Sequence, residues 1–224
     1  MQMEFVFGQN GISPILLELA DGTFVYLQGR IDRIDMTADG AVRIIDYKSG
    51  GKKFDPTLVY WGLQLQLLLY MAAAIARIPE SRAAGFFYCR VADPTVKTEI
   101  RMKEEVEKQI AKKLALSGIT LSDVSILRAQ GGAQAGMVTK DGKPNGRYAS
   151  SMVTDEGMEH LIAFARNKAT TLAGDIYAGI IDDSPYERGS LNACQSCDYA
   201  PICTFDPERK PRRRLSAKTL DDLL

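Results

Sequence analysis

Short apolar runs separated by turn-forming residues make up the first half of the chain. Strands are predicted at 4–7 and 15–18, and a longer alternating run, rich in Val, Ile and Phe, predicts a strand over 24–35. An Asp-Gly turn at 39–40 leads into a further apolar run over 41–47. Two apolar runs on either side of such a turn predict a β-hairpin.

The middle of the chain combines helical and strand periodicity. A largely apolar helix is predicted over 58–76, and it is expected to lie buried against the sheet. A strand is predicted at 83–91, followed by an amphipathic helix over 102–117 with Gly118 as its C-terminal cap. A strand, a long helix and a further strand in succession predict an α/β fold, with a central mixed β-sheet flanked by helices.

The second half contains two segments with the composition of mobile loops, at 129–136 and 140–151. A last long helix is predicted to begin after Thr154, a good N-cap residue, and to end near Ala178. A cysteine-containing segment and a basic tail follow. We therefore expect a helical and cysteine-containing extension after the α/β core.

Charge adds little to this picture as a total, because 28 basic and 28 acidic residues balance. A large, purely electrostatic grip on nucleic acid is therefore not expected. Basic residues do cluster locally, in the tail at 209–214 and around Lys48, Lys52 and Lys53. The tail fits two interpretations equally, a solvated and disordered end or a contact with phosphate.

No apolar run is long enough to cross a membrane, because the longest, at 63–78, is interrupted by Gln64, Gln66 and Arg77. The first ten residues lack the basic stretch and the apolar block of a signal peptide. These features make the cytoplasm the expected location.

The candidate chemistry lies on the predicted hairpin. Asp46 and Lys48 are two residues apart on one strand, so both side chains should lie on the same face, and Asp32 lies on the preceding strand. Two carboxylates and a lysine at a sheet edge suit a hard cation such as Mg²⁺, which activates water and offsets the charge that develops on phosphate. Lys48 would position the water or stabilise the transition state.

A surface ion pair between Lys48 and an aspartate is the plainer interpretation of the same residues. The neighbouring sequence argues against it, because Ile44 and Ile45 lead directly into Asp46 and Ile31 precedes Asp32. A strand this apolar is expected to be buried on both faces. Charged residues in such a place need a functional reason.

The segments GRIDRID at 29–35, IIDYKSG at 44–50 and YWGLQLQLLLY at 60–70 resemble the PD-(D/E)XK nuclease superfamily. Within it they are most similar to the RecB-type nuclease domain of the AddB family of bacterial helicase-nuclease subunits. The resemblance implies a restriction-endonuclease-like core. It also implies that Asp32 and Asp46 bind the divalent metal and that Lys48 is the catalytic lysine.

Gln66 and Tyr70 match the Gln-x-x-x-Tyr motif of the same family, which contributes to the active site. They are four residues apart and so share one helix face. The alternative is a core tyrosine and a satisfied buried amide. Gln64 is expected to project away from the site, and Asp35 to cap a turn or pair with an arginine rather than bind metal.

Three cysteines, Cys194, Cys197 and Cys203, are close enough in sequence to converge on one metal ion or iron–sulfur cluster. Zinc is the generic interpretation. The segment resembles the cysteine run of AddB-type nucleases, in which a fourth, upstream cysteine completes a structural 4Fe-4S cluster. That cysteine is missing here, since the remaining one, Cys89, lies in a predicted buried strand and is expected to be a core residue.

A metal-binding histidine that the family carries upstream of the GRID strand is also missing. The sole histidine, His160, falls in the last predicted helix and is expected to be a surface or packing residue. We therefore expect the chain to be a truncated piece of a longer protein, or a gene fragment. It contains no Gly-x4-Gly-Lys-Ser/Thr loop, so helicase activity would belong to missing segments or to an AddA-like partner subunit.

These observations predict a nuclease domain over 1–206, with its core at about 15–95, its cysteine segment at 194–203 and a basic tail at 207–224. The expected activity is Mg²⁺- or Mn²⁺-dependent exonuclease cleavage of DNA, within a helicase-nuclease for double-strand break repair and recombination. One alternative is a catalytically incomplete module of the same fold that binds DNA or a helicase. A weaker alternative is a small zinc protein.

Overall fold

The computed structural model describes residues 2–9, 13–78, 80–91, 103–130 and 136–224. Within them the chain forms a central sheet of six strands in the order β1-β4-β5-β6-β7-β8. β5 pairs in parallel with β6 and β7 with β8, and the other neighbours are antiparallel, so the sheet is mixed as predicted. The strands are β1 (Gln2–Phe7), β4 (Gly29–Met36), β5 (Ala41–Lys48), β6 (Arg82–Arg90), β7 (Ser117–Leu121) and β8 (Met152–Val153).

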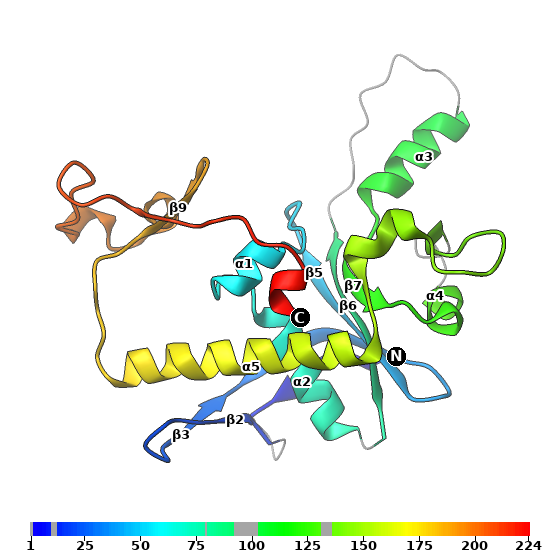
Figure 1. Ribbon diagram of the computed structural model, residues 1–224, viewed down its shortest axis with the longest axis horizontal. Helices are drawn as coiled ribbons and strands as arrows, with labels where there is room; N and C mark the ends of the chain where they lie inside the picture. Colours follow the sequence, from blue (N-terminus) through cyan, green and yellow to red (C-terminus); the bar gives the residue numbers. More distant parts are fainter. Residues whose placement is uncertain (1, 10–12, 79, 92–102, 131–135) are drawn as a thin grey trace.

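Two helices cover one face of this sheet. α2 (Gln66–Arg77) packs on β5 and β6, and α5 (Asp155–Tyr177) crosses α2, as Figure 1 shows. Ile44 of β5 and Phe86 of β6 are fully buried in the core that these helices complete. This is the α/β arrangement that the order of strands and helices predicts.

The strand β5 is buried on both faces, which confirms the expectation for the run that leads into Asp46. Ile44 faces the helices, and its neighbour Ile45, which faces the other side, is 4% exposed. Phe87, the register partner of Ile45 on β6, is 1% exposed. A polar residue that follows on this strand is therefore carried into a largely desolvated position.

The predicted helix over 58–76 is wrong as one continuous helix. The chain forms α1 (Pro56–Tyr60), breaks, and then forms α2. The break contains Gly62, whose φ of +82° lies in the left-handed region that favours glycine. Apolar periodicity continued across the break and concealed it.

Two other boundaries differ from the prediction. The run over 24–35 divides at Gln28 into β3 (Phe24–Leu27), which pairs with β2 (Ile15–Glu18) in a separate hairpin, and β4. The expected helix over 102–117 is α3 (Lys103–Lys113) in the described residues, and β7 begins at Ser117.

Gly118 is therefore not a helix cap. It lies inside β7, where a Cβ atom would come within 1.9 Å of the carbonyl oxygen of Phe86. The position needs glycine because two strands approach closely there, and a C-cap glycine gives the same signal in a sequence.

The hairpin of β4 and β5 and the long helix α5 are confirmed. Gly40 has a φ of +82° in the turn, and the Thr154 side chain accepts a hydrogen bond from the Gly157 backbone N–H at 3.1 Å. The predicted mobile loop at 140–151 instead contains the 3-10 helix η2 (Gly146–Ser151), which Asn145 caps. Most of the loop predicted at 129–136 lies outside the described residues.

The short helix α4 (Val124–Gln130) follows β7. No helix in the described segments is long and apolar enough to span a membrane.

After α5 the chain leaves the core for a small sheet of β10 (Leu191–Asn192), β9 (Tyr186–Arg188) and β11 (Arg213–Arg214), and then returns to it (Figure 1). Leu220 and Leu223 pack into the main core, Leu223 from the 3-10 helix η5 (Asp221–Leu223). The C-terminal segment is thus anchored to the α/β core.

Candidate active site

Asp46 and Lys48 lie at the end of β5, on the face of the sheet that α2 covers. Asp46 is 2% exposed, and its Oδ2 atom is 2.5 Å from the Nζ atom of Lys48. In the parallel register with β6, Asp46 pairs with Tyr88 and Lys48 with Arg90. The sheet therefore places a carboxylate, a phenol and two basic residues at the C-terminal ends of β5 and β6, where α2 begins.

Asp32 reaches this end of the sheet from β4. The antiparallel register of β4 and β5 ends at Arg33↔Ile45, and beyond it the Asp32 Oδ2 atom accepts a hydrogen bond from the backbone N–H of Tyr47 at 2.8 Å. The charge of Asp32 adds to burial in raising the pKa of Asp46. The structure thus brings the two predicted metal ligands together.

Gln66 and Tyr70 join the same group from the first turns of α2. The Lys48 Nζ atom donates to the Gln66 Oε1 atom at 3.2 Å, and the Gln66 Nε2 atom donates to the Tyr70 hydroxyl at 2.9 Å. The predicted one-face spacing of Gln66 and Tyr70 holds, since both contacts form on one side of the helix. Lys48 is held between the amide of α2 and the carboxylate of β5.

Burial dominates the electrostatics of Asp46. Desolvation raises the pKa of its carboxyl above the ordinary value, repulsion from Asp32 adds to this, and attraction to Lys48 and Lys52 opposes it. The Oδ2 atom of Asp46 makes the ion pair with Lys48 but no hydrogen bond of good geometry to a described group. A buried oxygen in that condition is one that a cation would stabilise.

The donor set fits a hard divalent cation. Among the described residues no group of three or more His, Cys, Asp or Glu side chains is arranged to hold a metal ion, so the protein offers two carboxylates here. Mg²⁺ is commonly held by one or two carboxylates together with water and substrate phosphate. Asp32 and Asp46 meet that requirement.

The roles of two residues beside the site were not predicted from the sequence. The ring of Tyr88 lies under the ammonium groups of Lys48 and Lys52, at 5.8 and 5.0 Å from its centroid. Burial raises the pKa of the Tyr88 hydroxyl, which has no hydrogen-bond partner in the described part of the chain. A tyrosine inside an apolar strand gives no sign of this role, and only the register with Asp46 reveals it.

Gln64 is the second residue, and it holds the loop that carries Lys52 and Lys53. It does not join the Lys48 cluster, as expected. Its side chain, 3% exposed, accepts from the backbone N–H of Asp55 at 2.8 Å and donates to the backbone carbonyl of Lys53 at 2.8 Å. The prediction of one continuous helix hid this role, because Gln64 precedes α2.

The three clustered cysteines do not converge on a metal site. Cys194 is half-buried, Cys197 and Cys203 are exposed, and no metal-holding group is found among the described residues. As arranged, these thiols do not fit an iron–sulfur cluster or a zinc ion, and we assign them no cofactor. Cys89, in β6, is half-buried, and burial raises the pKa of its thiol.

Two other residues considered in the sequence have the surroundings expected of them. Asp35 pairs with Arg33 at 2.8 Å and with Arg43 at 2.5 Å, as predicted. His160 is exposed on α5, which confirms a surface position.

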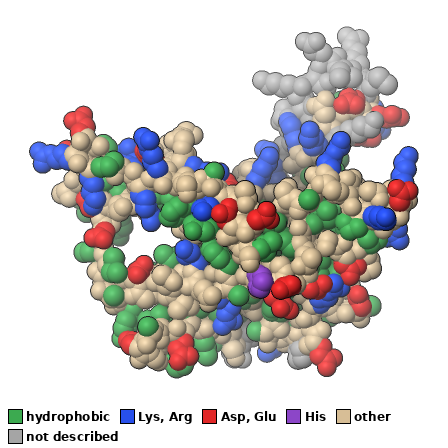
Figure 2. Space-filling model, viewed as in Figure 1, with side chains coloured by type: hydrophobic (Ala, Val, Ile, Leu, Met, Phe, Trp, Pro, Cys, Tyr) green, Lys and Arg blue, Asp and Glu red, His purple; other side chains and the backbone are tan. Residues whose placement is uncertain are grey.

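Several side chains of the basic tail contact groups within the chain. Arg214 lies 3.1 Å from Glu187, and Lys210 pairs with Asp183. The Arg213 guanidinium lies over the ring of Trp61. Figure 2 shows Lys and Arg side chains gathered over this C-terminal segment and, separately, beside α3. The side chains of the tail nevertheless stay solvated, since those of Arg209 and Arg214 are 88% and 89% exposed.

Comparisons with known proteins point to one family. Residues 1–204 match the PD-(D/E)XK nuclease superfamily. The chain is 38% identical to a subunit of the ATP-dependent helicase/deoxyribonuclease of Alkaliphilus metalliredigens, over 92% of this chain and 19% of that protein. It is 37% identical to the subunit of the same name from Clostridium botulinum strain Hall, over 86% of this chain and 18% of that protein. The chain therefore spans less than a fifth of the length of these relatives.

Proposed function

Because this chain belongs to the PD-(D/E)XK nuclease superfamily, we propose that it hydrolyses phosphodiester bonds of DNA with the help of Mg²⁺ or Mn²⁺. One observation carries the proposal. A buried carboxylate, that of Asp46, lies 2.5 Å from the ammonium group of Lys48, and burial and the nearby charge of Asp32 raise its pKa. Charges in so buried a position are costly unless they are paired or bind a ligand, and carboxylates with a shifted pKa gather at functional sites.

Asp32 and Asp46 would hold the cation. When bound, the cation lowers the pKa of a water molecule and offsets the negative charge that develops on the phosphate. The hydrogen bond from the Tyr47 backbone N–H fixes the Asp32 carboxylate, so this ligand loses little freedom on binding. A bound cation would relieve the repulsion between the two carboxylates, and this relief would favour its binding.

Lys48 would donate to the attacking water or to a phosphoryl oxygen. Its ammonium group is held by Asp46 and by the Gln66 Oε1 atom, so its position is set before DNA binds. A preorganised donor stabilises developing charge without reorganisation in the transition state. Tyr70 would act through Gln66, whose amide it orients by accepting a hydrogen bond at 2.9 Å.

We further propose an exonuclease activity on DNA ends that works beside a helicase. The relatives are named as subunits of an ATP-dependent helicase/deoxyribonuclease, and this chain matches 19% of their length. An AddA-like partner subunit, and a place in double-strand break repair and recombination, are parts of the same proposal.

A second candidate function is a module that binds DNA or a helicase without cleavage. It is favoured by the small ligand set, since the described residues supply two carboxylates and no histidine at the site. Metal binding separates the two candidates. The nuclease predicts Mn²⁺ binding that Asp46→Asn removes, and the module predicts none.

The decisive experiment is digestion of end-labelled linear DNA with Mg²⁺ or Mn²⁺ by the parent chain and by Lys48→Ala. The control variant is Lys140→Ala, at an exposed lysine outside the site. Cleavage by the parent and the control, and none by Lys48→Ala, would support the nuclease. Equal cleavage by all three would exclude Lys48 from catalysis, and no cleavage by any of them would favour the binding module.

A further inference from the structure

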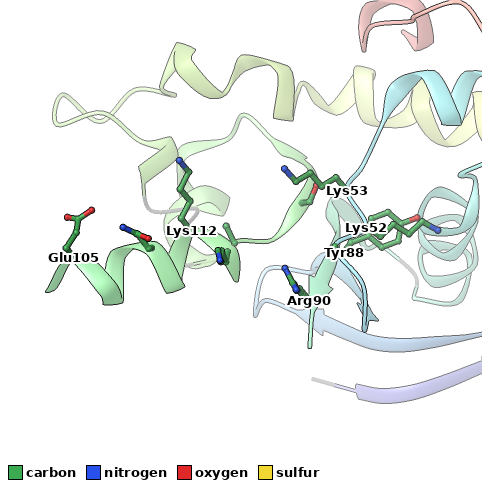
Figure 3. A pocket seen from close by; sticks show the side chains of 11 residues that line it. Lys52, Lys53, Tyr88, Arg90, Glu105 and Lys112 are labelled. Atoms are coloured by element: carbon green, nitrogen blue, oxygen red, sulfur yellow. The ribbon is translucent and has the colours of Figure 1, made fainter. Parts of the chain in front are cut away.

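A cleft of about 740 Å³ opens beside the candidate active site, between the loop after β5, the end of β6 and helix α3. We call it the β6–α3 cleft. Its charged side chains come from three elements: Lys52 and Lys53 from the loop, Arg90 from β6, and Glu105, Lys112 and Lys113 from α3. In Figure 3, Lys53 and Arg90 extend toward the side of the cleft from which Lys112 rises.

The cleft is strongly basic in a chain with no net charge. Five of its lining residues are Lys or Arg, and one, Glu105, is acidic. None of the ion pairs among the described residues includes Lys53, Arg90 or Lys112. Because these three cations form no ion pair within the described chain, the cleft favours an anionic ligand.

Two further observations indicate a ligand at the inner end of the cleft. Arg90 and Tyr88 line the cleft, and the buried Nε atom of Arg90 and the buried hydroxyl of Tyr88 have no hydrogen-bond partner in the described residues. Buried donors are rarely left in that state in a complete assembly. Desolvation and repulsion from Lys48 lower the pKa of Lys52.

Tyr88 connects the cleft to Asp46 and Lys48. It lines the cleft, pairs with Asp46 in the sheet register, and carries Lys48 and Lys52 over its ring. Figure 3 shows Lys52 and Tyr88 extending away from the side on which Lys53 and Lys112 lie. An extended polyanion in the cleft would therefore continue past Tyr88 to Lys48.

The loop that bears the lysines is fixed in this position. Gln64 binds the backbone of Lys53 and Asp55, and the backbone N–H of Phe54 donates to the Ser117 hydroxyl at 3.0 Å. These bonds tie the loop to the start of β7 and to the segment before α2. The basic side chains are therefore displayed from a constrained backbone.

We propose that the β6–α3 cleft binds the phosphate backbone of the DNA strand adjacent to the phosphate that is cleaved. This assignment rests on the proposed nuclease function. Lys53, Arg90 and Lys112 contact successive phosphates, and Lys52 contacts the phosphate nearest the candidate active site. The cleft is favoured over the basic tail, whose Lys210 and Arg214 are paired with carboxylates of the chain.

The test is binding of a short fluorescein-labelled single-stranded oligodeoxynucleotide, measured by anisotropy in chelator over a range of salt concentrations. The variant is Lys53→Ala/Arg90→Ala/Lys112→Ala. The matched control is Lys140→Ala/Lys143→Ala/Arg147→Ala, which removes the same number of positive charges at exposed positions that do not line the cleft. A charge-conserving variant, Lys53→Arg/Arg90→Lys/Lys112→Arg, separates loss of charge from loss of folding.

The cleft variant is expected to bind at least about tenfold more weakly at low salt. Its plot of log Kd against log salt is expected to be shallower by about 2, since each phosphate contact on a single strand contributes about 0.7. The control and the charge-conserving variant should bind like the parent.

Because binding is measured without metal, the result does not depend on cleavage. Parent-like binding by the cleft variant overturns the assignment, even if the chain degrades DNA. Failure of the parent to bind at low salt overturns it as well. Binding that depends on the cleft in a chain that cleaves no DNA supports the cleft and counts against the nuclease.

Discussion

The carboxylate of Asp32 accepts a hydrogen bond from the backbone N–H of Tyr47 at 2.8 Å, at the point where the paired register of β4 and β5 ends. A side chain of one strand thus takes the N–H group that the ladder no longer satisfies. This contact keeps the end of β5 joined to β4 and places the charge of Asp32 beside Asp46. The position of the two carboxylates is therefore a property of the sheet, present before any cation binds.

Replacing Asp46 by Asn is expected to abolish Mn²⁺ binding and DNA cleavage while raising the Tm at neutral pH. The pKa of Asp46 is raised mainly by burial, so its ionised form opposes folding above that pKa. Asn removes this cost, and Lys48, whose side chain is 27% exposed, stays hydrated. A gain of about 1 kcal/mol would raise the Tm by roughly 2–4 °C in a chain of this size.

The pH dependence of the Tm tests whether Asp46→Asn stabilises the protein for this reason. The advantage of Asp46→Asn should shrink as the pH falls, because protonation of Asp46 in the parent then relieves the same cost. It should be gone below the ordinary aspartate pKa of about 3.9. A Tm lower than that of the parent at neutral pH would show that the Lys48 ion pair outweighs desolvation.

Substitutions of Gln66 and Tyr70 should lower the rate of cleavage to different extents. Tyr70→Phe removes the acceptor of one Gln66 hydrogen bond and leaves the Lys48 contact. A hydrogen bond contributes about 0.5–1.5 kcal/mol, so kcat should fall by up to about tenfold with KM little changed. Gln66→Ala removes both bonds and should cost more.

Steady-state cleavage of a labelled oligonucleotide measures this difference. Tyr26→Phe, at an exposed tyrosine of β3, serves as the control for loss of a hydroxyl. An unchanged kcat in Gln66→Ala would mean that Lys48 needs no partner on α2.

Gln64→Ala is expected to destabilise the protein and to release the loop that carries Lys52 and Lys53. The buried amide makes two backbone hydrogen bonds, and their loss leaves buried polar groups unsatisfied. Such a loss costs about 1–3 kcal/mol. Thermal unfolding and amide hydrogen exchange at residues 53–55 measure the two effects.

The control is Gln195→Ala, at an exposed glutamine that makes one backbone hydrogen bond, to the Ser190 carbonyl. It should leave the Tm within about a degree or two of the parent, as surface substitutions usually do. A Gln64→Ala variant as stable as the control, with unchanged exchange in the loop, would contradict a clamp role for Gln64.

The candidate active site was predictable because its residues lie in periodic structure. Asp46 and Lys48 share a face by strand alternation, and Gln66 and Tyr70 share a face by helical spacing, wherever the helix begins. To predict that Asp32 lies beside Asp46 required the hairpin, which the Asp-Gly turn at 39–40 indicated.

The residues that were not predictable depend on breaks and on pairing between distant strands. Tyr88 joins the site through the parallel pairing of β5 and β6, whose register no local pattern specifies. Gln64 gains its role because the chain breaks at Gly62, where apolar periodicity continues without interruption. Gly118 meets a neighbouring strand and not a helix end, and both environments select glycine.

Arg82, at the start of β6, ties two later segments to the sheet and gives a prediction for acid pH. It contacts Asp123, just before α4, at 2.9 Å and Asp155, in the first turn of α5, at 2.5 Å. Hydrogen bonds from Ser125 and from Arg82 lower the pKa of Asp123 to about 2.

A lowered pKa in the folded protein stabilises it above the ordinary aspartate value of about 3.9, and this contribution is lost as the pH falls toward 2. Asp123→Asn should therefore be less stable than the parent at neutral pH, by no more than about 1 kcal/mol because the pair is partly exposed. The difference should be largely lost near pH 2 and absent at lower pH. Asp198→Asn, at an exposed aspartate outside the ion pairs of the described chain, should match the parent throughout. A stability difference for Asp123→Asn that does not change between neutral and acid pH would mean that the carboxylate charge is not what Arg82 and Ser125 stabilise.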